Sequence, residues 1–239
     1  MNMVLRWMKI KVSELKLELE NISSTEKRAA YQWFFKTGKG DYGEGDSFIG
    51  VTMPELHKAA KKYKNLEFNE IRELLKSPIH EHRMVGLLIL VLRYEKQKKE
   101  VFEFYLENVE AANNWDLIDV TAPKVIGKYL LENPKEKDLL YNFANSSDLW
   151  KKRISIISTM TFIKNNQFED AIKISEILIK DEHDLIHKAV GWMLREIGKK
   201  DEVKLKEFLN KHIREMSRTT LRYSIEKLDS EERLRYLRM

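Results

Sequence analysis

The residues best suited to chemistry lie around one carboxylate, that of Asp119. Trp115 stands four residues before it, so the two side chains share one face of a helix. A second aromatic–basic pair, Trp192 and Arg195, stands three residues apart later in the chain. Indole faces attract cations and cover sugar or base surfaces, so the pattern indicates a cleft with aromatic walls around a carboxylate. A tryptophan taken alone would be expected in the core.

The carboxylates of this segment also have simpler interpretations. Asp116 falls in the first turn of the expected helix, where a carboxylate usually serves the helix dipole or the cap. Asp119 lies deeper in the helix and could form an ion pair with Arg153, 34 residues later. Both possibilities stay open for Asp119 at the level of sequence.

A repeat of about 35 residues relates these positions. The successive members are Arg83, Asp119, Arg153, Lys188 and Arg222, with gaps of 36, 34, 35 and 34 residues. Such a period, with two helices per unit, is typical of a HEAT-like or tetratricopeptide α-solenoid, and the tetratricopeptide signature is missing. We therefore predict a HEAT-like stack whose second helices line a concave face. The row along that face is basic except at Asp119.

The elements that must position this row are predicted to be helices only. Nine glycines and four prolines are few for a β protein, and most segments have helical period. About fourteen helices and no hairpin are expected, with starts near Ser24, Met53, Ser77, Pro134 and Asp184. The fold class is thus an all-α solenoid, and we expect one domain over residues 1–239. It would comprise N-terminal helices 1–37, a glycine-rich connection 38–50 and repeats 51–239.

Composition excludes several classes of protein. The chain has no cysteine, which removes thiol catalysis, disulfides and cysteine-bound metals. Its longest apolar run, residues 84–92, is far shorter than the roughly 20 residues that span a membrane. Arg6, Lys9 and Lys11 interrupt the apolar start, so no secretory segment is expected. A cytoplasmic protein with no membrane partner is predicted, and its net charge of +5 permits a polyanionic one.

Three motifs carry a family resemblance. Trp115-x-x-x-Asp119, Lys151-Lys152-Arg153 and HKAVGWMLRE with Trp192 resemble the motifs of AlkD-like DNA alkylation-repair glycosylases, in the same order and with spacings of 34 and 39 residues. The segment KTGKGDYGEGDSFIGVTMPELHKAAKKY is similar to one found in many members. The resemblance extends from about residue 24 to residue 237.

The resemblance implies a HEAT-like solenoid that grips double-stranded DNA and excises cationic N3- and N7-alkylpurines. It implies that Asp119 is catalytic, that Trp115 and Trp192 hold the sugar, and that Arg153 lies beside them. The further basic residues expected to bind DNA are Lys152, Lys188, Arg195 and Arg222. No metal or organic cofactor is implied, and a monomer is expected.

Such a reaction needs few groups. Glycoside hydrolysis usually takes two carboxyl groups, but an alkylated purine cation leaves as a neutral base without an acid. One carboxylate near the sugar could then stabilise the developing cation by about 4 kcal/mol at about 4 Å.

The sequence departs from the family pattern near its start. Gly38, Gly40, Gly43 and Gly45 form an insertion, and Phe34 and Phe35 stand where some members carry tyrosine. The insertion also matches a dinucleotide fingerprint, but it follows a helix and carries acidic residues, so a flexible connection is expected instead.

Two alternatives are weighed against this interpretation. His183 and His187 are spaced like paired metal ligands, but no third ligand is evident, and a capping or core role is favoured. The competing function is a non-catalytic HEAT-like module that binds DNA structures or serves as a protein scaffold.

Overall fold

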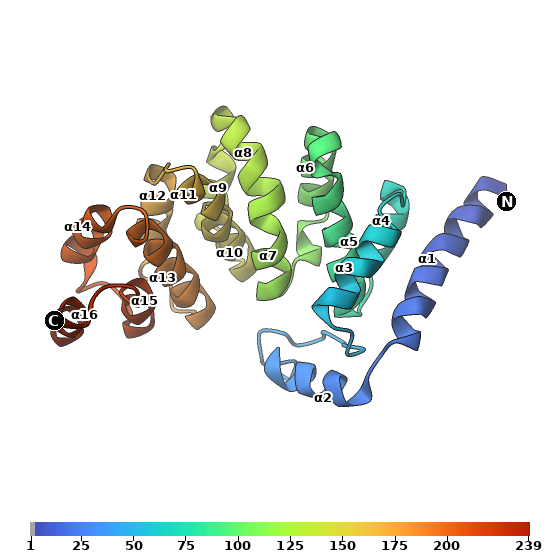
Figure 1. The fold of residues 1–239 in the computed structure, drawn as a ribbon, viewed down its shortest axis with the longest axis horizontal. Coiled ribbons are helices and arrows are strands. Elements are labelled where there is room, and N and C mark those ends of the chain that lie inside the picture. The colour runs from blue at the N-terminus through green and yellow to red at the C-terminus, as the bar shows by residue number, and fades with distance from the viewer. Residues whose placement is uncertain (1–2) are drawn as a thin grey trace. The chain divides into compact units, whose positions relative to one another are not determined.

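The computed structural model describes the backbone of residues 3–239 and the side chains from Lys11 onward. Arg6 and Lys9, which interrupt the apolar start, lie outside the described side chains. The described residues contain no strand, and their single β-bridge joins Ser47 to Ile79. The all-α prediction is therefore confirmed (Figure 1). None of the described helices is long and apolar enough to cross a membrane.

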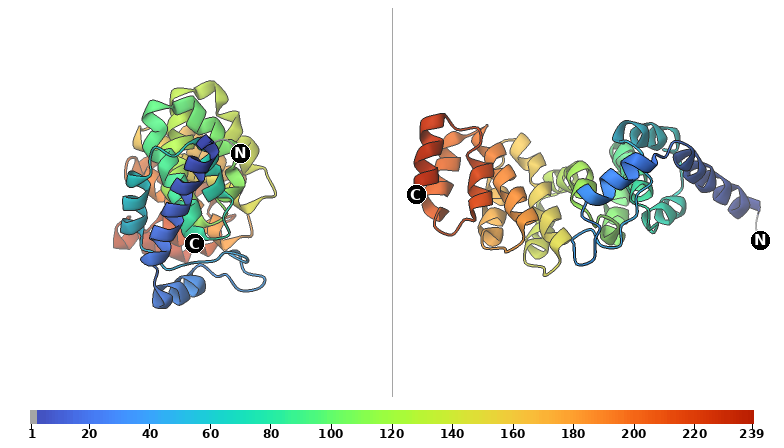
Figure 2. Two further views of the ribbon diagram at one scale, coloured as in Figure 1. Left: turned by 90° about the vertical axis from the view of Figure 1, so that its right-hand side faces the viewer. Right: turned by 90° about the horizontal axis from the view of Figure 1, so that it is seen from below.

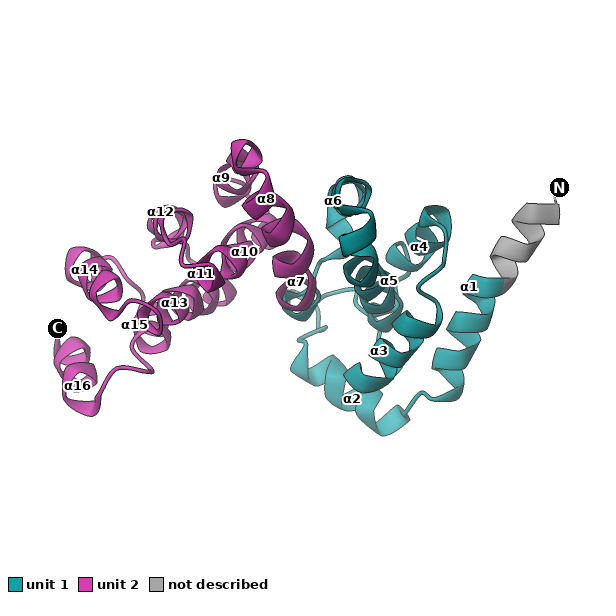
Figure 3. Ribbon diagram, turned by 45° about the horizontal axis from the view of Figure 1, so that its top comes forward, with its two compact units in different colours: residues 1–117 teal, residues 118–239 magenta. Residues whose placement is uncertain are grey.

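The chain divides into two compact units, residues 1–117 and residues 118–239 (Figure 3). The first unit contains α1 (Met3–Asn21), α2 (Thr25–Phe34), α3 (Met53–Lys62), α4 (Phe68–Leu75), α5 (His80–Arg93) and α6 (Lys98–Glu107). Helix α7 (Trp115–Ala122) contains the unit boundary. The second unit continues with α8 (Lys128–Glu132), α9 (Asp138–Ala144), α10 (Leu149–Ser158), α11 (Met160–Lys164), α12 (Glu169–Leu178), α13 (Asp184–Gly198), α14 (Glu202–His212), α15 (Arg218–Ser224) and α16 (Ser230–Arg238). The expectation of one domain over the whole chain stays a prediction.

Side-chain caps fix where several helices begin. Ser24 accepts a hydrogen bond from the Lys27 N–H and starts α2, and His183 accepts from the Leu185 N–H and starts α13. The prediction at Ser77 is wrong by two residues, because Ile79 is the N-cap and α5 begins at His80. Ser77 instead uses its hydroxyl to accept from the Ile79 N–H, which orders the turn before the helix.

Helix pairs repeat within residues 118–239. α9 packs on α10, α12 on α13, and α13 on both α14 and α15. Successive pairs also contact one another, because α10 packs on α13 and α9 on α12. Figure 2 shows these helices following one another in sequence order, from yellow to red. This stacking of neighbouring helical pairs is the arrangement of a helical-repeat protein.

In the first unit, α5 forms the centre and packs against α3, α4 and α6. It is buried over most of its circumference, from His80 to Leu90. Arg83 is 4% exposed and donates to Asp46, to Asn113 and to the carbonyls of Ser77 and Ala111. The prediction that Arg83 contributes to an exposed basic row is therefore wrong, since internal acceptors use its guanidinium.

The glycine-rich segment 38–50 is an ordered part of this unit. Gly40, Gly45 and Gly50 have positive φ values of 82°, 89° and 82°, which glycine adopts without strain. These turns bring Asp46 and Phe48 back into the core, where they are 7% and 1% exposed. The segment therefore differs from the flexible connection that its composition predicts.

Candidate functional site

Asp119 and Arg153 form a bidentate ion pair in the second unit. Arg153 donates from Nε to one carboxylate oxygen at 2.9 Å and from Nη2 to the other at 2.8 Å. Its remaining nitrogen, Nη1, donates to the Leu185 carbonyl at 2.6 Å. The side chains are 5% and 15% exposed for Arg153 and Asp119, so the pair is largely shielded from water. Both oxygens of Asp119 are thus fixed in position.

The regular α-helical hydrogen bonding of α7 ends at Ala122, three residues after Asp119. Pro123 stands four residues later and has no N–H to donate to the Asp119 carbonyl. A π-helical turn follows from Pro123 to Gly127 before α8 begins. Such turns are common at functional sites because they change the register of the side chains that follow.

A cavity of about 370 Å³ opens beside the carboxylate. Asp119 and Trp192 line it together with three lysines, and Asp119 is the one carboxylate among the lining residues. The lysines come from the π turn, from α8 and from the end of α11: Lys124, Lys128 and Lys164. Two of them, Lys124 and Lys164, are exposed. The cavity therefore joins one carboxylate and one indole to a strongly basic rim.

Trp192 is oriented by its own helix. Its Nε1 donates to Glu196 at 3.2 Å, one turn later in α13, and the side chain is half-buried. Of the predicted set, Asp119, Arg153 and Trp192 are thus brought together.

The other predicted basic residues lie apart from this cavity. Lys152 pairs with Asp181 at 2.6 Å, Lys188 pairs with Asp184 at 2.7 Å, and Arg195 pairs with Glu226. Arg222 is exposed on α15. Acidic neighbours therefore offset three of these four positive charges.

Trp115, at the start of α7, belongs to an aromatic cluster of the first unit. Its ring stacks on Phe35 with centroids 5.2 Å apart and meets Phe34 edge-on at 5.8 Å. Its backbone N–H donates to Asn114 Oδ1 at 2.8 Å. Trp115 therefore has a defined ring plane one helical turn before Asp119.

Asp116 has a structural partner, as the sequence suggests, but the partner is not the helix end. It accepts a hydrogen bond from His80 Nε2 at 2.9 Å, while His80 Nδ1 donates to Asp46 at 3.1 Å. Burial disfavours the charged imidazole, but the two carboxylates outweigh this and raise the pKa of His80 to about 9. Burial likewise opposes ionisation of Asp46, yet His80 and Arg83 together lower its pKa.

Sequence reasoning missed the lysines of the cavity. Lys164 could have been found, because it follows Arg153 by eleven residues, which is three helical turns. Lys124 and Lys128 could not, because the π turn between them changes which face their side chains occupy.

The paired histidines behave as capping and packing groups. His183 accepts the hydrogen bond that starts α13, and His187 Nε2 contacts the Asp181 carbonyl at 2.5 Å. Over the described side chains, no three His, Asp or Glu residues gather as ligands for a metal ion.

Comparison with known proteins identifies the family. The sequence model of the family described as "DNA alkylation repair enzyme" matches residues 15–228. No protein with a curated description matches the chain significantly.

Two solved structures share the fold. A predicted DNA alkylation repair enzyme from Enterococcus faecalis aligns with a TM-score of 0.70 at 17% identity, over 87% of this chain and 97% of its own. AlkD2 from Streptococcus mutans aligns with a TM-score of 0.57 at 20% identity, over 93% and 100%. Since the family match covers most of the sequence and the helical repeats agree with both structures, this chain belongs to the DNA alkylation repair enzyme family.

Proposed function

We propose that the protein is a DNA glycosylase that hydrolyses the N-glycosidic bond of cationic N3- and N7-alkylated purines in duplex DNA. The observation that carries this proposal is the Asp119 carboxylate, held on both oxygens by Arg153 and facing a cavity that it shares with Trp192. Such a fixed carboxylate can face a sugar cation without reorganising during the reaction.

The chemistry of the leaving group suits a site with one carboxylate. An alkylated purine that carries a positive charge departs as a neutral base, so no general acid is needed. A neutral purine would need protonation, and no second carboxyl group lines the cavity to supply it. The site therefore favours labile cationic lesions over undamaged bases.

Electrostatics sets the size of the effect. A sugar cation about 4 Å from the carboxylate gains about 4 kcal/mol at an effective dielectric constant near 20, and the guanidinium about 8 Å away removes about 2 kcal/mol. The net stabilisation of about 2 kcal/mol corresponds to roughly 30-fold in rate. Arg153 thus positions the carboxylate and weakens its field.

In this proposal, the lysines around the cavity bind the phosphates of the DNA backbone. Lys124, Lys128 and Lys164 surround the carboxylate with positive charge, which suits the backbone on either side of a lesion. In this proposal Trp192 covers the sugar at the same cavity, and Trp115 supplies a second aromatic surface. Lys152, Lys188, Arg195 and Arg222 add weaker contacts to a protein that acts as a monomer without a cofactor.

The test is release of N7-methylguanine and N3-methyladenine from methylated duplex DNA. Wild type should release both, and Asp119→Asn should slow release by two to three decades while affinity for DNA is kept. Asp138→Asn, an exposed aspartate on α9, is the matched control and should release bases at the wild-type rate.

The bidentate pair also favours a second candidate, a DNA-binding module without catalysis. Arg153 engages both oxygens of Asp119, as it would in a purely structural ion pair. Well-folded wild type that binds methylated duplex DNA and releases no base would establish this candidate and refute the glycosylase.

A further inference from the structure

Trp192 lines the cavity beside Asp119, and the packing of α13 on α15 fixes its backbone. The preceding residue, Gly191, lies so close to α15 that an added Cβ would meet the Thr220 carbonyl oxygen at 2.6 Å. The side chain of Trp192 has more freedom, because it is half-buried and an indole can turn about two bonds. A ring that is to cover a sugar must keep one plane, so the indole needs an anchor of its own.

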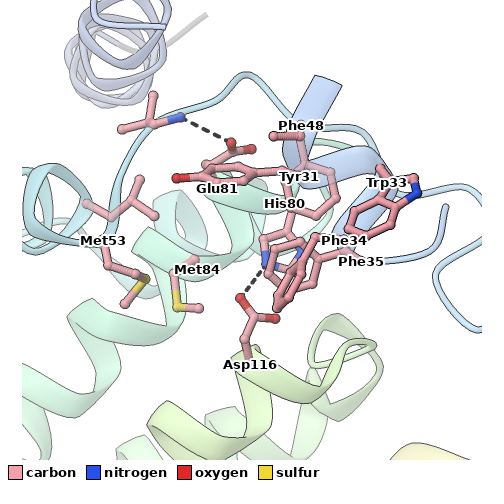
Figure 4. Close-up of a pocket in the computed structure, with 13 residues that line it drawn as sticks. Tyr31, Trp33, Phe34, Phe35, Phe48, Met53, His80, Glu81, Met84 and Asp116 are labelled. Carbon is pink, nitrogen blue, oxygen red and sulfur yellow. Dashed lines mark hydrogen bonds and ion pairs between the residues drawn. The ribbon is translucent and has the colours of Figure 1, made fainter. Parts of the chain in front are cut away.

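The rings around the larger cavity, which lies in the first unit, hold one another (Figure 4). That cavity has a volume of about 500 Å³. Phe35 stacks on Phe48 with centroids 4.9 Å apart and meets Phe34 edge-on at 5.1 Å. Stacked and edge-on contacts of this kind fix the planes of the rings. Trp192 is held in a different way, by a hydrogen bond from its indole nitrogen.

Glu196 accepts this hydrogen bond. One of its oxygens, Oε1, accepts from Trp192 Nε1 at 3.2 Å and from Lys199 Nζ at 2.6 Å. Trp192 and Lys199 stand four residues before and three residues after Glu196, so the three side chains share one face of the helix. A half-turn of the indole would move Nε1 to the opposite edge of the ring and break the bond. Glu196 therefore stabilises one orientation of the Trp192 ring.

Two cations beside Glu196 offset its charge. Lys199 pairs with it directly, and Arg195 Nε lies 3.7 Å from the same oxygen, which is beyond hydrogen-bond distance. Arg195 instead pairs through Nη1 with Glu226. Positive charges this close reduce the field that the carboxylate exerts in the cavity. The effect of Glu196 on a bound nucleotide must then pass through the Trp192 ring.

We propose that Glu196 is a positioning residue, which fixes the indole of Trp192 over the sugar and so sets how strongly the site prefers a cationic nucleotide. The faces of an indole attract positive charge, whereas its edge carries positive partial charge. A ring that can turn presents its edge to the sugar as well as its face, and the attraction is reduced. This inference rests on the proposed function, because it places Trp192 on the sugar of the lesion.

Three substitutions isolate the hydrogen bond. Glu196→Ala removes the acceptor. Glu196→Gln keeps it, because Trp192 and Lys199 donate to the same oxygen and one amide oxygen can serve both donors. Lys199→Gln is the matched control, since it removes the lysine and leaves the contact between Glu196 and Trp192. A fourth substitution, Trp192→Phe, keeps an aromatic ring without an N–H to donate.

The experiment compares two duplexes by fluorescence anisotropy. One contains an abasic pyrrolidine nucleotide, whose protonated nitrogen stands where the sugar cation forms, and the other contains the uncharged tetrahydrofuran analogue. Wild type should prefer the charged duplex by about tenfold or more. Glu196→Ala should lower this preference by about fivefold, and Glu196→Gln and Lys199→Gln should keep it. Added to Trp192→Phe, Glu196→Ala should cause no further loss.

The indole N–H signals in ¹H–¹⁵N NMR spectra test the hydrogen bond without DNA. The signal of Trp192 is the one that disappears in Trp192→Phe. It should move further upfield in Glu196→Ala than in Glu196→Gln, because only the alanine variant lacks an acceptor. Unfolding temperatures verify that each variant is folded.

The outcomes separate this inference from the proposed function. An unchanged preference in Glu196→Ala, or the same loss when it is added to Trp192→Phe, overturns the positioning role even when methylated bases are excised. Wild type that binds the two duplexes equally also overturns it. An equal loss in Lys199→Gln overturns it as well, by showing that Lys199 is the group that acts. The expected pattern of binding without any base release refutes the glycosylase and keeps the positioning role.

Discussion

Asp119 and Arg153 share two hydrogen bonds, so the effect of changing one depends on the other. In Asp119→Asn the guanidinium remains and repels a sugar cation, so the loss is the full carboxylate attraction of about 4 kcal/mol. In Asp119→Asn/Arg153→Gln both charges are gone, and the loss is about 2 kcal/mol. We expect the double variant to release N7-methylguanine faster than the single variant, by roughly 30-fold in single-turnover assays.

One result would contradict the view that Arg153 acts through Asp119. If the double variant is as slow as Asp119→Asn or slower, Arg153 acts on the DNA rather than through Asp119. Affinity for undamaged duplex DNA, measured in parallel, shows whether a lost phosphate contact is the reason.

His80 predicts an alkaline limit to stability. Its pKa is raised to about 9, so its protonated form stabilises the fold fully below pH 6.5, and this contribution is lost as the pH rises through 9. The loss amounts to about 3 kcal/mol of the free energy of unfolding. Because the chain has no cysteine, no thiol titrates in this window. Urea unfolding between pH 6.5 and 9.5 measures it.

His82 predicts an acidic limit, with the opposite sign. Burial lowers its pKa to about 4, so the stability that depends on its neutral form is present above pH 6.5 and is lost as the pH falls toward 4. In the variant His82→Gln, the free energy of unfolding should fall less between pH 6.5 and 4. Its fall between pH 6.5 and 9.5 should be unchanged. If the free energy of unfolding of His82→Gln stays constant from pH 6.5 to 9.5, the alkaline limit does not come from His80.

The sequence predicts which individual residues matter better than it predicts their hydrogen-bond partners. The repeat places Asp119 and Arg153 in successive units, and their ion pair was one of the two open possibilities. The network of His80, Asp46 and Asp116 could not be predicted, because Asp46 joins it from a loop without periodicity.

Close backbone contact decides the packing of α13 on α15. A Cβ added at Gly191 would lie 2.5 Å from the Tyr223 Cβ and 2.6 Å from the Thr220 carbonyl oxygen. Neither atom can move without shifting α15. We expect Gly191→Ala to reduce the free energy of unfolding by about 1–3 kcal/mol, as overpacking does elsewhere. Thermal or urea unfolding measures the effect.

Gly198 in the same helix is the matched control. A Cβ there would meet Leu205 Cδ2 at 2.4 Å, which is the far end of a flexible side chain. Gly198→Ala should therefore change stability little, since a rotamer change relieves the contact. Equal losses in the two variants would show that helix α13, and not its contact with α15, is the sensitive feature.

The sequence predicts the start of a helix well where a side chain caps its first turn. It misplaces the start of α5, which has no side-chain cap. Ser24 and Asp184 mark α2 and α13 closely, because capping is a local interaction. Ser77 precedes a proline like a cap, but its hydroxyl orders the preceding turn, so α5 begins three residues later. The π turn after Asp119 follows from Pro123, yet its effect on the later side chains needs coordinates.

The number of phosphates that the protein contacts sets the salt dependence of DNA binding. Each phosphate neutralised lowers the slope of log affinity against log salt by about 0.9. If Lys124, Lys128 and Lys164 each contact a phosphate, replacing all three with glutamine should make the slope shallower by about 2.7. Fluorescence anisotropy with one duplex at several salt concentrations measures both slopes. The same triple change at Lys152, Lys188 and Lys199 serves as the control and should have a smaller effect, because none of these three lysines lines the cavity.

The repeat of about 35 residues was the strongest whole-molecule signal in the sequence. It predicted stacked helical pairs, and the contacts from α9 to α15 confirm them. The position of Arg83 shows the limit of such reasoning. A repeat predicts which residues correspond, but the acceptors that bury one of them come from a segment outside the repeat.

The hydrogen bonding of its nucleophilic side chains affects how readily alkylating agents modify this protein. A repair protein for alkylated DNA works among the same electrophiles that damage DNA, and thiolates are the side chains they attack most readily. This chain has no cysteine, Asp119 has both oxygens bound to Arg153, and His80 has both ring nitrogens hydrogen-bonded. Lone pairs engaged in this way are poor targets for methylating agents. The hydrogen bonds that fix Asp119 and His80 thus also reduce their reactivity toward methylating agents.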